Sequence, residues 1–205
     1  MKRTYWMLLL LLACGSTLAQ TNQSEGKVIG AGLQAERGEA TLDAQRERRA
    51  LQILLKSVEK QVVSAADAMP ADKYGYAPTD GEFKGVRTFG QEVKHLAATN
   101  YILAAAALGE APPTDAGDEV GPEAARTKAE TLDYVNGSFA HLGKAIDAIG
   151  DKNITVKSSP ISPLRGGVAT RSALAVEALI HAFDHYGQMV EYLRMNGVVP
   201  PASRP

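Results

Sequence analysis

Cysteine is almost absent from the sequence, since Cys14 is the only one among 205 residues. A disulfide framework is therefore excluded. An excess of charge of one sign is also lacking, because 22 Lys and Arg balance 23 Asp and Glu to give a formal net charge of −1. Without a basic excess, the composition gives no indication of nucleic-acid binding. The stability of the fold must come from the burial of apolar side chains.

Long apolar runs are missing too, and the one leucine-rich run is short and lies at the N-terminus. Residues 1–3 contain Lys and Arg, residues 5–13 contain five consecutive leucines, and small residues follow as far as Ala19. This order predicts an export signal over residues 1–19, too short to be a stable membrane anchor, and a periplasmic or extracellular protein. Cleavage after Ala19 would leave a chain without cysteine, which excludes a cysteine nucleophile.

Cys14 offers an alternative at the same end of the chain. Leu11-Leu12-Ala13-Cys14 is close to a bacterial lipoprotein cleavage box. Lipid modification of Cys14 would tether the protein to a membrane. Both interpretations take the protein out of the cytosol.

The rest of the chain is interpreted as a tail followed by one domain. Residues 20–40 are polar, contain glycine and lack sustained periodicity, so we expect a polar tail or linker there. Residues 41–205 form the expected domain, which is long enough for a hydrophobic core.

Four segments of this domain show apolar residues at helical spacing, and none shows convincing strand alternation. The expected helices cover residues 42–69, 89–108, 122–149 and 169–196. Thr88 and Gln91 form a capping box before the second, Pro122 is a favourable first-turn residue for the third, and Asn196-Gly197 ends the fourth. The pattern predicts an all-α four-helix bundle with long irregular connections and an open topology.

Two common catalytic signatures are missing. No Gly-x-Ser-x-Gly motif occurs, which removes the usual serine-hydrolase signal. Gly75, Gly81 and Gly85 are unevenly spaced and follow no strand, so they do not form a phosphate-binding loop.

Histidines supply the clearest chemical pattern. His181 and His185 lie four residues apart and share one side of the fourth expected helix, and His95 lies on the second. Three neutral imidazoles can hold one metal ion and leave a coordination position open, as in catalytic sites. Ala182 follows His181, so the zincin motif His-Glu-x-x-His is absent.

The apolar periodicity leaves a simpler alternative, in which these histidines are ordinary surface residues. His181 and His185 fall opposite the richest apolar side of their helix, and His95 falls away from the apolar stripe of its own. That apolar side of the fourth helix holds Val176, Leu179, Ile180, Phe183, Val190 and Leu193. A crevice between helices would reconcile the pattern with a metal site.

The neighbours of the histidine pair suggest supporting roles. Glu177 and Gln188 could hydrogen-bond the non-ligating ring nitrogens, although simple exposure is the preferred interpretation for Glu177. Glu177 and Tyr192 are also the nearest candidates for a general base. His141 stands alone and is not expected to be a ligand, and Asn100 is expected to be a hydrogen-bonded structural amide.

Residues 42–203 resemble the DinB-like family of four-helix proteins, which are described as metal-dependent hydrolases and are related to metal-dependent thiol transferases. The resemblance is most specific in residues 87–101, 181–188, 192–194 and 196–201. It implies a divalent-metal site formed by His95, His181 and His185, a bundle with a long crossover, and frequent formation of a homodimer.

Three functions remain open from the sequence. The first is an exported metal-dependent hydrolase of an unknown small-molecule substrate, and the second is a metal- or small-ligand-binding bundle without turnover. The third is a structural or interaction bundle whose histidines align by chance. A metal-dependent thiol S-transferase is a further alternative, although an export signal suits it less well. Zinc, nickel, iron and copper all accept three imidazoles, so the ligands do not identify the metal.

Overall fold

The structure is a computed structural model that describes residues 15–116, 119–150, 155–157, 161–162 and 168–204. The chain divides into two units, residues 1–43 and residues 44–205. The predicted lipidation site Cys14 and most of the predicted export signal lie outside the described residues. Among the residues that are described, no helix is both long and apolar enough to cross a membrane.

The first helix is longer than the sequence pattern predicts. Helix α1 covers Gly15–Ala68, so residues 20–40 are helical and not irregular. This part has no apolar periodicity, so the pattern did not predict a helix there. Residues such as Ala, Gln, Glu and Arg favour a helix intrinsically and need no apolar face to form one. Residues 15–43 belong to the first unit and residues 44–68 to the second.

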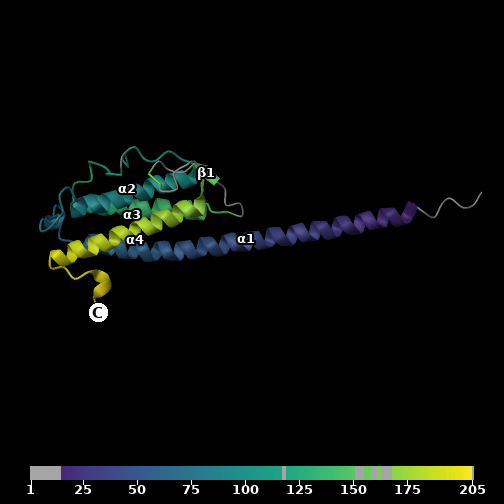
Figure 1. The fold of residues 1–205 in the computed structure, drawn as a ribbon, viewed down its shortest axis with the longest axis horizontal. Coiled ribbons are helices and arrows are strands. Elements are labelled where there is room, and N and C mark those ends of the chain that lie inside the picture. Colours follow the sequence, from purple (N-terminus) through teal and green to yellow (C-terminus); the bar gives the residue numbers. More distant parts are fainter. Residues whose placement is uncertain (1–14, 117–118, 151–154, 158–160, 163–167, 205) are drawn as a thin grey trace, which may run out of the picture. The chain divides into compact units, whose positions relative to one another are not determined.

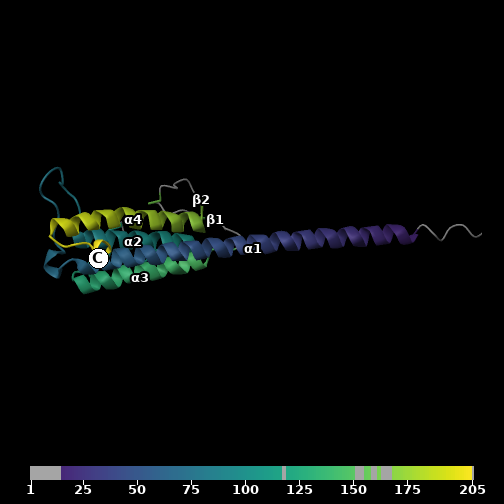
Figure 2. The same ribbon diagram turned by 90° about the horizontal axis from the view of Figure 1, so that it is seen from below.

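The second unit is the predicted helical bundle. It combines residues 44–68 of α1 with α2 (Phe89–Leu108), α3 (Lys128–Asp147) and α4 (Arg171–Met195), which run side by side in Figures 1 and 2. Two 3-10 turns, Ala71–Lys73 and Pro201–Ser203, lie in the connection after α1 and near the C-terminus. The core contains Leu55, Met69, Phe89, Leu96, Phe139, Leu142, Ile146, Leu174, Met189 and Leu193.

Local capping explains where two of the helices begin. The Thr88–Gln91 capping box that starts α2 is confirmed. Helix α3 begins at Lys128 and not at Pro122, because Thr127 and Glu130 form a second capping box. The interpretation of Pro122 as a first-turn residue is therefore wrong.

Contacts between helix ends define the topology that the sequence left open. Lys128 at the start of α3 pairs with Asp67 at the end of α1, and Gln52 bonds Asp147 at the other end, so α1 and α3 are antiparallel. Arg171 at the start of α4 bonds the carbonyl of Ala107 at the end of α2, so these two are also antiparallel. Arg171 also bonds the carbonyl of Ala148 just beyond α3, so α2 and α3 end together and run parallel, and the connection between them returns along the bundle.

Two short strands were not predicted. Strands β1 (Thr155–Lys157) and β2 (Val168–Thr170) pair antiparallel, with Val156 opposite Ala169. Thr170 ends β2 and also caps α4, since its side chain accepts a hydrogen bond from the Ala173 amide. Three-residue strands are too short for alternation to be visible in a sequence.

The apolar face predicted for α4 is only partly buried, since Leu179 and Leu193 lie in the core but three other members are exposed. The side chains of Val176, Ile180 and Phe183 are 41 %, 64 % and 41 % exposed. The buried face carries three alanines and the second histidine of the pair among larger side chains. Its members are Leu174, Ala175, Ala178, Leu179, Ala182, His185, Met189, Tyr192 and Leu193. A periodicity analysis favours large apolar side chains and gives little weight to the buried alanines.

Candidate metal centre

The three predicted histidines meet in the bundle. His95 comes from α2, and His181 and His185 come from successive turns of α4. Nε2 of His181 lies 3.3 Å from Nε2 of His95 and 3.0 Å from Nε2 of His185. His95 and His185 are buried, contrary to the surface alternative, because α2 packs against both α3 and α4.

The opposite nitrogens of two rings are held by other groups. Nδ1 of His95 lies 2.8 Å from the backbone oxygen of Glu119, and Nδ1 of His185 contacts the carboxylate of Glu92. A carbonyl and a carboxylate accept hydrogen bonds, so each Nδ1 carries the proton and each Nε2 presents a lone pair. The Nε2 atoms of these two rings can therefore act as metal ligands, and they face the centre of the group.

This donor set fits a metal ion. In a tetrahedral site with metal–nitrogen distances of about 2.0–2.1 Å, two nitrogens lie about 3.3 Å apart. The two Nε2–Nε2 distances, 3.0 and 3.3 Å, are close to this separation. One candidate ligand atom from each of the three residues lies within 4.8 Å of the others. The group can thus hold one ion through three nitrogens.

Burial also keeps the imidazoles in the form that binds metal. It lowers the pKa of His181 to about 3, with smaller contributions from the neighbouring rings of His185 and His95. Burial likewise lowers the pKa of His95, and Arg87 acts in the same direction. Both rings are neutral near pH 7, so a metal ion does not have to displace a proton from them.

Glu119 is held in an unusual backbone conformation. Its φ is 64°, and it is the one non-glycine residue with positive φ in the part of the chain that the structure describes. Such strain persists where the surroundings require it, and here it accompanies the bond between the Glu119 carbonyl and His95. The Glu119 carboxylate also lies 3.7 Å from Nδ1 of His95. The crossover between α2 and α3 thus supplies part of the site.

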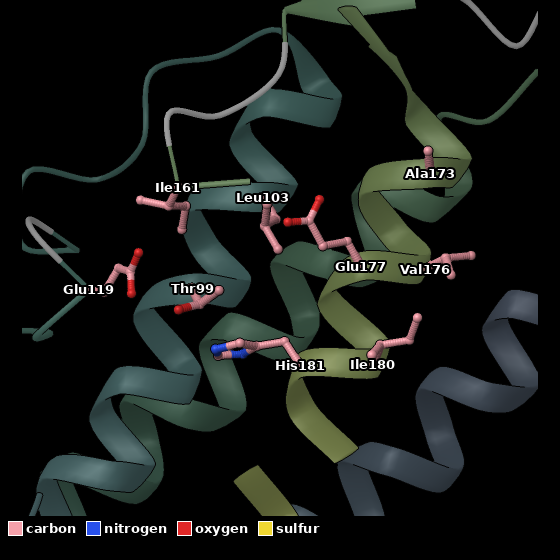
Figure 3. Close-up of a pocket in the computed structure, with 9 residues that line it drawn as sticks. All are labelled: Thr99, Leu103, Glu119, Ile161, Ala173, Val176, Glu177, Ile180 and His181. Carbon is pink, nitrogen blue, oxygen red and sulfur yellow. The ribbon is translucent and has the colours of Figure 1, made fainter. Parts of the chain in front are cut away.

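A cavity of about 560 Å³ opens beside the histidines. Figure 3 shows residues of α2 and α4 on its two sides, with His181 and Glu177 both extending from α4 toward α2. The lining residues are Thr99, Leu103, Glu119, Ile161, Ala173, Val176, Glu177, Ile180 and His181. This size suits a small molecule, and the lining is mainly apolar.

The supporting residues differ from those expected. Gln188 donates to Asp184, and Glu177 accepts a hydrogen bond from Ser162, so neither bonds a histidine ring. Their place is taken by Glu92 and by the backbone of Glu119. Tyr192 donates its hydroxyl hydrogen bond to the carbonyl of Arg87 and is not among the cavity-lining residues.

The remaining candidates lie away from the centre. His141 packs against Tyr101 and is not part of the three-histidine group, as expected. The amide nitrogen of Asn100 donates to Ser138 as expected, but its amide oxygen is buried with no hydrogen-bond partner among the described residues, so the expectation of a satisfied structural amide holds only in part. No sequence signal marked Glu119, because its contact with His95 uses a backbone oxygen that every residue has.

Comparison with known families supports the geometric assignment. The sequence model of a family described as the DinB superfamily matches residues 54–189, a segment that includes His95, His181 and His185. Comparison with curated proteins finds no match. The match covers more than half of the chain and the whole histidine group, and the chain belongs to the DinB superfamily.

Proposed function

We propose that this protein is a metal-dependent hydrolase of a small molecule, with His95, His181 and His185 as the ligands of one divalent ion. The observation that carries the proposal is the convergence of three Nε2 atoms beside a largely apolar cavity. Three protein ligands leave a coordination position open, which is the pattern of catalytic sites. Zinc, nickel and iron are the metals to test first.

The chain's own residues have separable roles in this proposal. Glu92 and the Glu119 carbonyl orient two of the rings, and the apolar walls keep the bound substrate away from bulk water. A bound divalent ion would activate water or polarise a substrate oxygen. Of the two carboxylates that line the cavity, that of Glu119 lies 3.7 Å from Nδ1 of His95, so Glu119 is the proposed proton acceptor.

The proposed cellular location of this activity is outside the cytosol. The predicted signal over residues 1–19 supports a periplasmic or extracellular enzyme, and lipidation at Cys14 is the alternative. Mass spectrometry of the mature protein from the cell-envelope and culture fractions would identify its N-terminus. This distinguishes cleavage after Ala19 from lipidation at Cys14.

Turnover measurements test the proposal. The full chain, loaded in turn with zinc, nickel and iron, would be assayed on ester, amide and phosphoester panels beside a His181→Ala, His185→Ala variant. We expect turnover that needs the metal and is lost in the variant. His141→Ala is the matched control, because His141 lies outside the group, and it should retain full activity.

Two results would contradict the hydrolase. Turnover that is equal with and without metal would remove the three histidines from catalysis. Stoichiometric metal binding with no turnover on any panel would instead establish a metal-binding bundle without catalysis.

A further inference from the structure

The cavity beside the histidines has an uneven distribution of polar groups. Leu103, Ile161, Ala173, Val176 and Ile180 form its apolar walls. Two carboxylates, those of Glu119 and Glu177, reach the same space, and the lining residues that the structure describes include no Lys or Arg. A ligand that fills this space must bury an apolar body next to negative charge.

Glu177 is built into the cavity wall and does not simply extend into solvent. It is half-buried, and its Oε2 accepts a hydrogen bond of 2.6 Å from the hydroxyl of the buried Ser162. This bond fixes the direction of the carboxylate, which Figure 3 shows extending from α4 toward Leu103 on α2. A carboxylate has about four acceptor positions, so the group can accept further hydrogen bonds from a ligand.

Thr99 gives an independent indication that a polar ligand group belongs here. It lines the cavity, its residue is 4 % exposed, and its Oγ1 is buried with no hydrogen-bond partner among the described residues. A buried hydroxyl without a partner is costly, and a ligand would remove that cost. Thr99 and Glu177 lie on opposite sides of the cavity, on α2 and α4.

Helix geometry sets the spacing of the two polar ends. Glu177 precedes His181 by four residues on α4, so the two side chains lie on one helix side with their Cα atoms about 6 Å apart along the axis. A ligand that places one polar group at the histidines therefore meets Glu177 about one helical turn away. The wall between them is apolar.

We propose that this cavity binds small molecules with an apolar body and an ammonium group, and that Glu177 selects for the positive charge. The inference rests on the proposed function, because it takes the histidine group as the reacting end of the same cavity. The ammonium group donates hydrogen bonds to Glu177, the apolar body lies against Leu103 and Val176, and the reacting group faces His181. Glu177 acts in this arrangement as a specificity residue.

Two probes that share one apolar body test the charge selection. The zinc-loaded full chain would be titrated by calorimetry with 2-phenylethylamine and with 2-phenylethanol. We expect the amine to bind about tenfold more tightly, because its ammonium group forms an ion pair with the Glu177 carboxylate and the uncharged hydroxyl does not. The Glu177→Gln variant should bring the amine to the affinity of the alcohol and leave the alcohol unchanged.

Further variants make the result specific. Glu191→Gln removes an exposed carboxylate from the same helix and should change neither affinity. Ser162→Ala removes the bond that orients Glu177 and should weaken the amine alone. Ala173→Phe should fill the cavity and weaken both probes. Circular dichroism of each variant would show that it is folded.

Several outcomes would overturn the inference. Equal binding of the two probes would remove the charge selection, and amine binding that survives Glu177→Gln would place its site elsewhere. Unchanged binding in Ala173→Phe would show that the probes do not use this cavity. Elemental analysis of the same samples reports the metal separately, so loss of the amine preference and loss of the metal site are distinguishable.

Discussion

At the scale of single residues, the site depends on which nitrogen of each ring carries the proton. Glu92 is buried and contacts Nδ1 of His185, which leaves Nε2 of that ring as a metal donor. The carbonyl of Glu119 does the same for His95. These contacts fix both the tautomer and the orientation of the rings, as acceptors behind metal-binding histidines commonly do.

Glu92→Gln tests this role. The amide keeps the shape of the side chain but replaces the carboxylate with a weaker, neutral acceptor, so we expect metal affinity to fall about 10- to 100-fold in a folded protein. Competition with a metal-sensitive dye would measure the affinity. Asp184→Asn is the matched control, since Asp184 is an exposed neighbour of His185 that bonds Gln188. Equal affinities for wild type and Glu92→Gln would show that Glu92 does not support the metal.

Sequence reasoning named the three histidines but not the groups behind them. His181 and His185 share a helix side by spacing, His95 lies on a separate expected helix, and the resemblance to the family joined the three in one expected site. Glu92 precedes His95 by only three residues, yet its partner is His185 on another helix. Such a contact depends on helix packing, which one-dimensional spacing does not contain.

At the scale of elements, Arg171 connects three helices. It lies at the start of α4, and its guanidinium donates 2.9 Å hydrogen bonds to the carbonyls of Ala107 and Ala148. These carbonyls lie at or just beyond the ends of α2 and α3, where backbone oxygens lack helical partners. The side chain thus ties the N-terminus of α4 to two helix C-termini.

Arg171→Met should therefore destabilise the bundle. Two charge-assisted bonds are lost and two carbonyls lose their hydrogen-bond donor, so we expect the free energy of unfolding to fall by about 1–3 kcal/mol. Urea denaturation followed by circular dichroism would measure it. Arg194→Met removes an exposed ion pair with Glu191 and should cost at most about 1 kcal/mol. Similar small losses in both variants would contradict the role of Arg171.

Helix positions were easier to predict than helix faces. The bounds of α2 were predicted correctly because its capping box and its terminal Gly109 are local signals. The buried face of α4 was not, because Ala175, Ala178 and Ala182 are buried while larger residues such as Ile180 remain exposed. Hydrophobicity summed along a helix favours large side chains, whereas close helix packing favours small ones.

At the scale of the whole bundle, the crossover between α2 and α3 links fold to site. It lets α2 and α3 run parallel, and it carries Glu119 past His95. The family resemblance implied a long crossover, but nothing in the sequence placed it between these two helices or indicated that its backbone would reach a histidine. A contact of this kind depends on the path of the chain and leaves no mark in residue type.

The most direct test of the central claim is the metal content of the full chain beside a His181→Ala, His185→Ala variant, measured by elemental analysis after reloading and mild dialysis. The three-histidine site predicts about one equivalent of zinc, nickel or iron in the wild type and none in a variant that circular dichroism shows to be folded. An equal metal content in both proteins, or no metal in either after reloading, would contradict the assignment of His95, His181 and His185 as a metal centre.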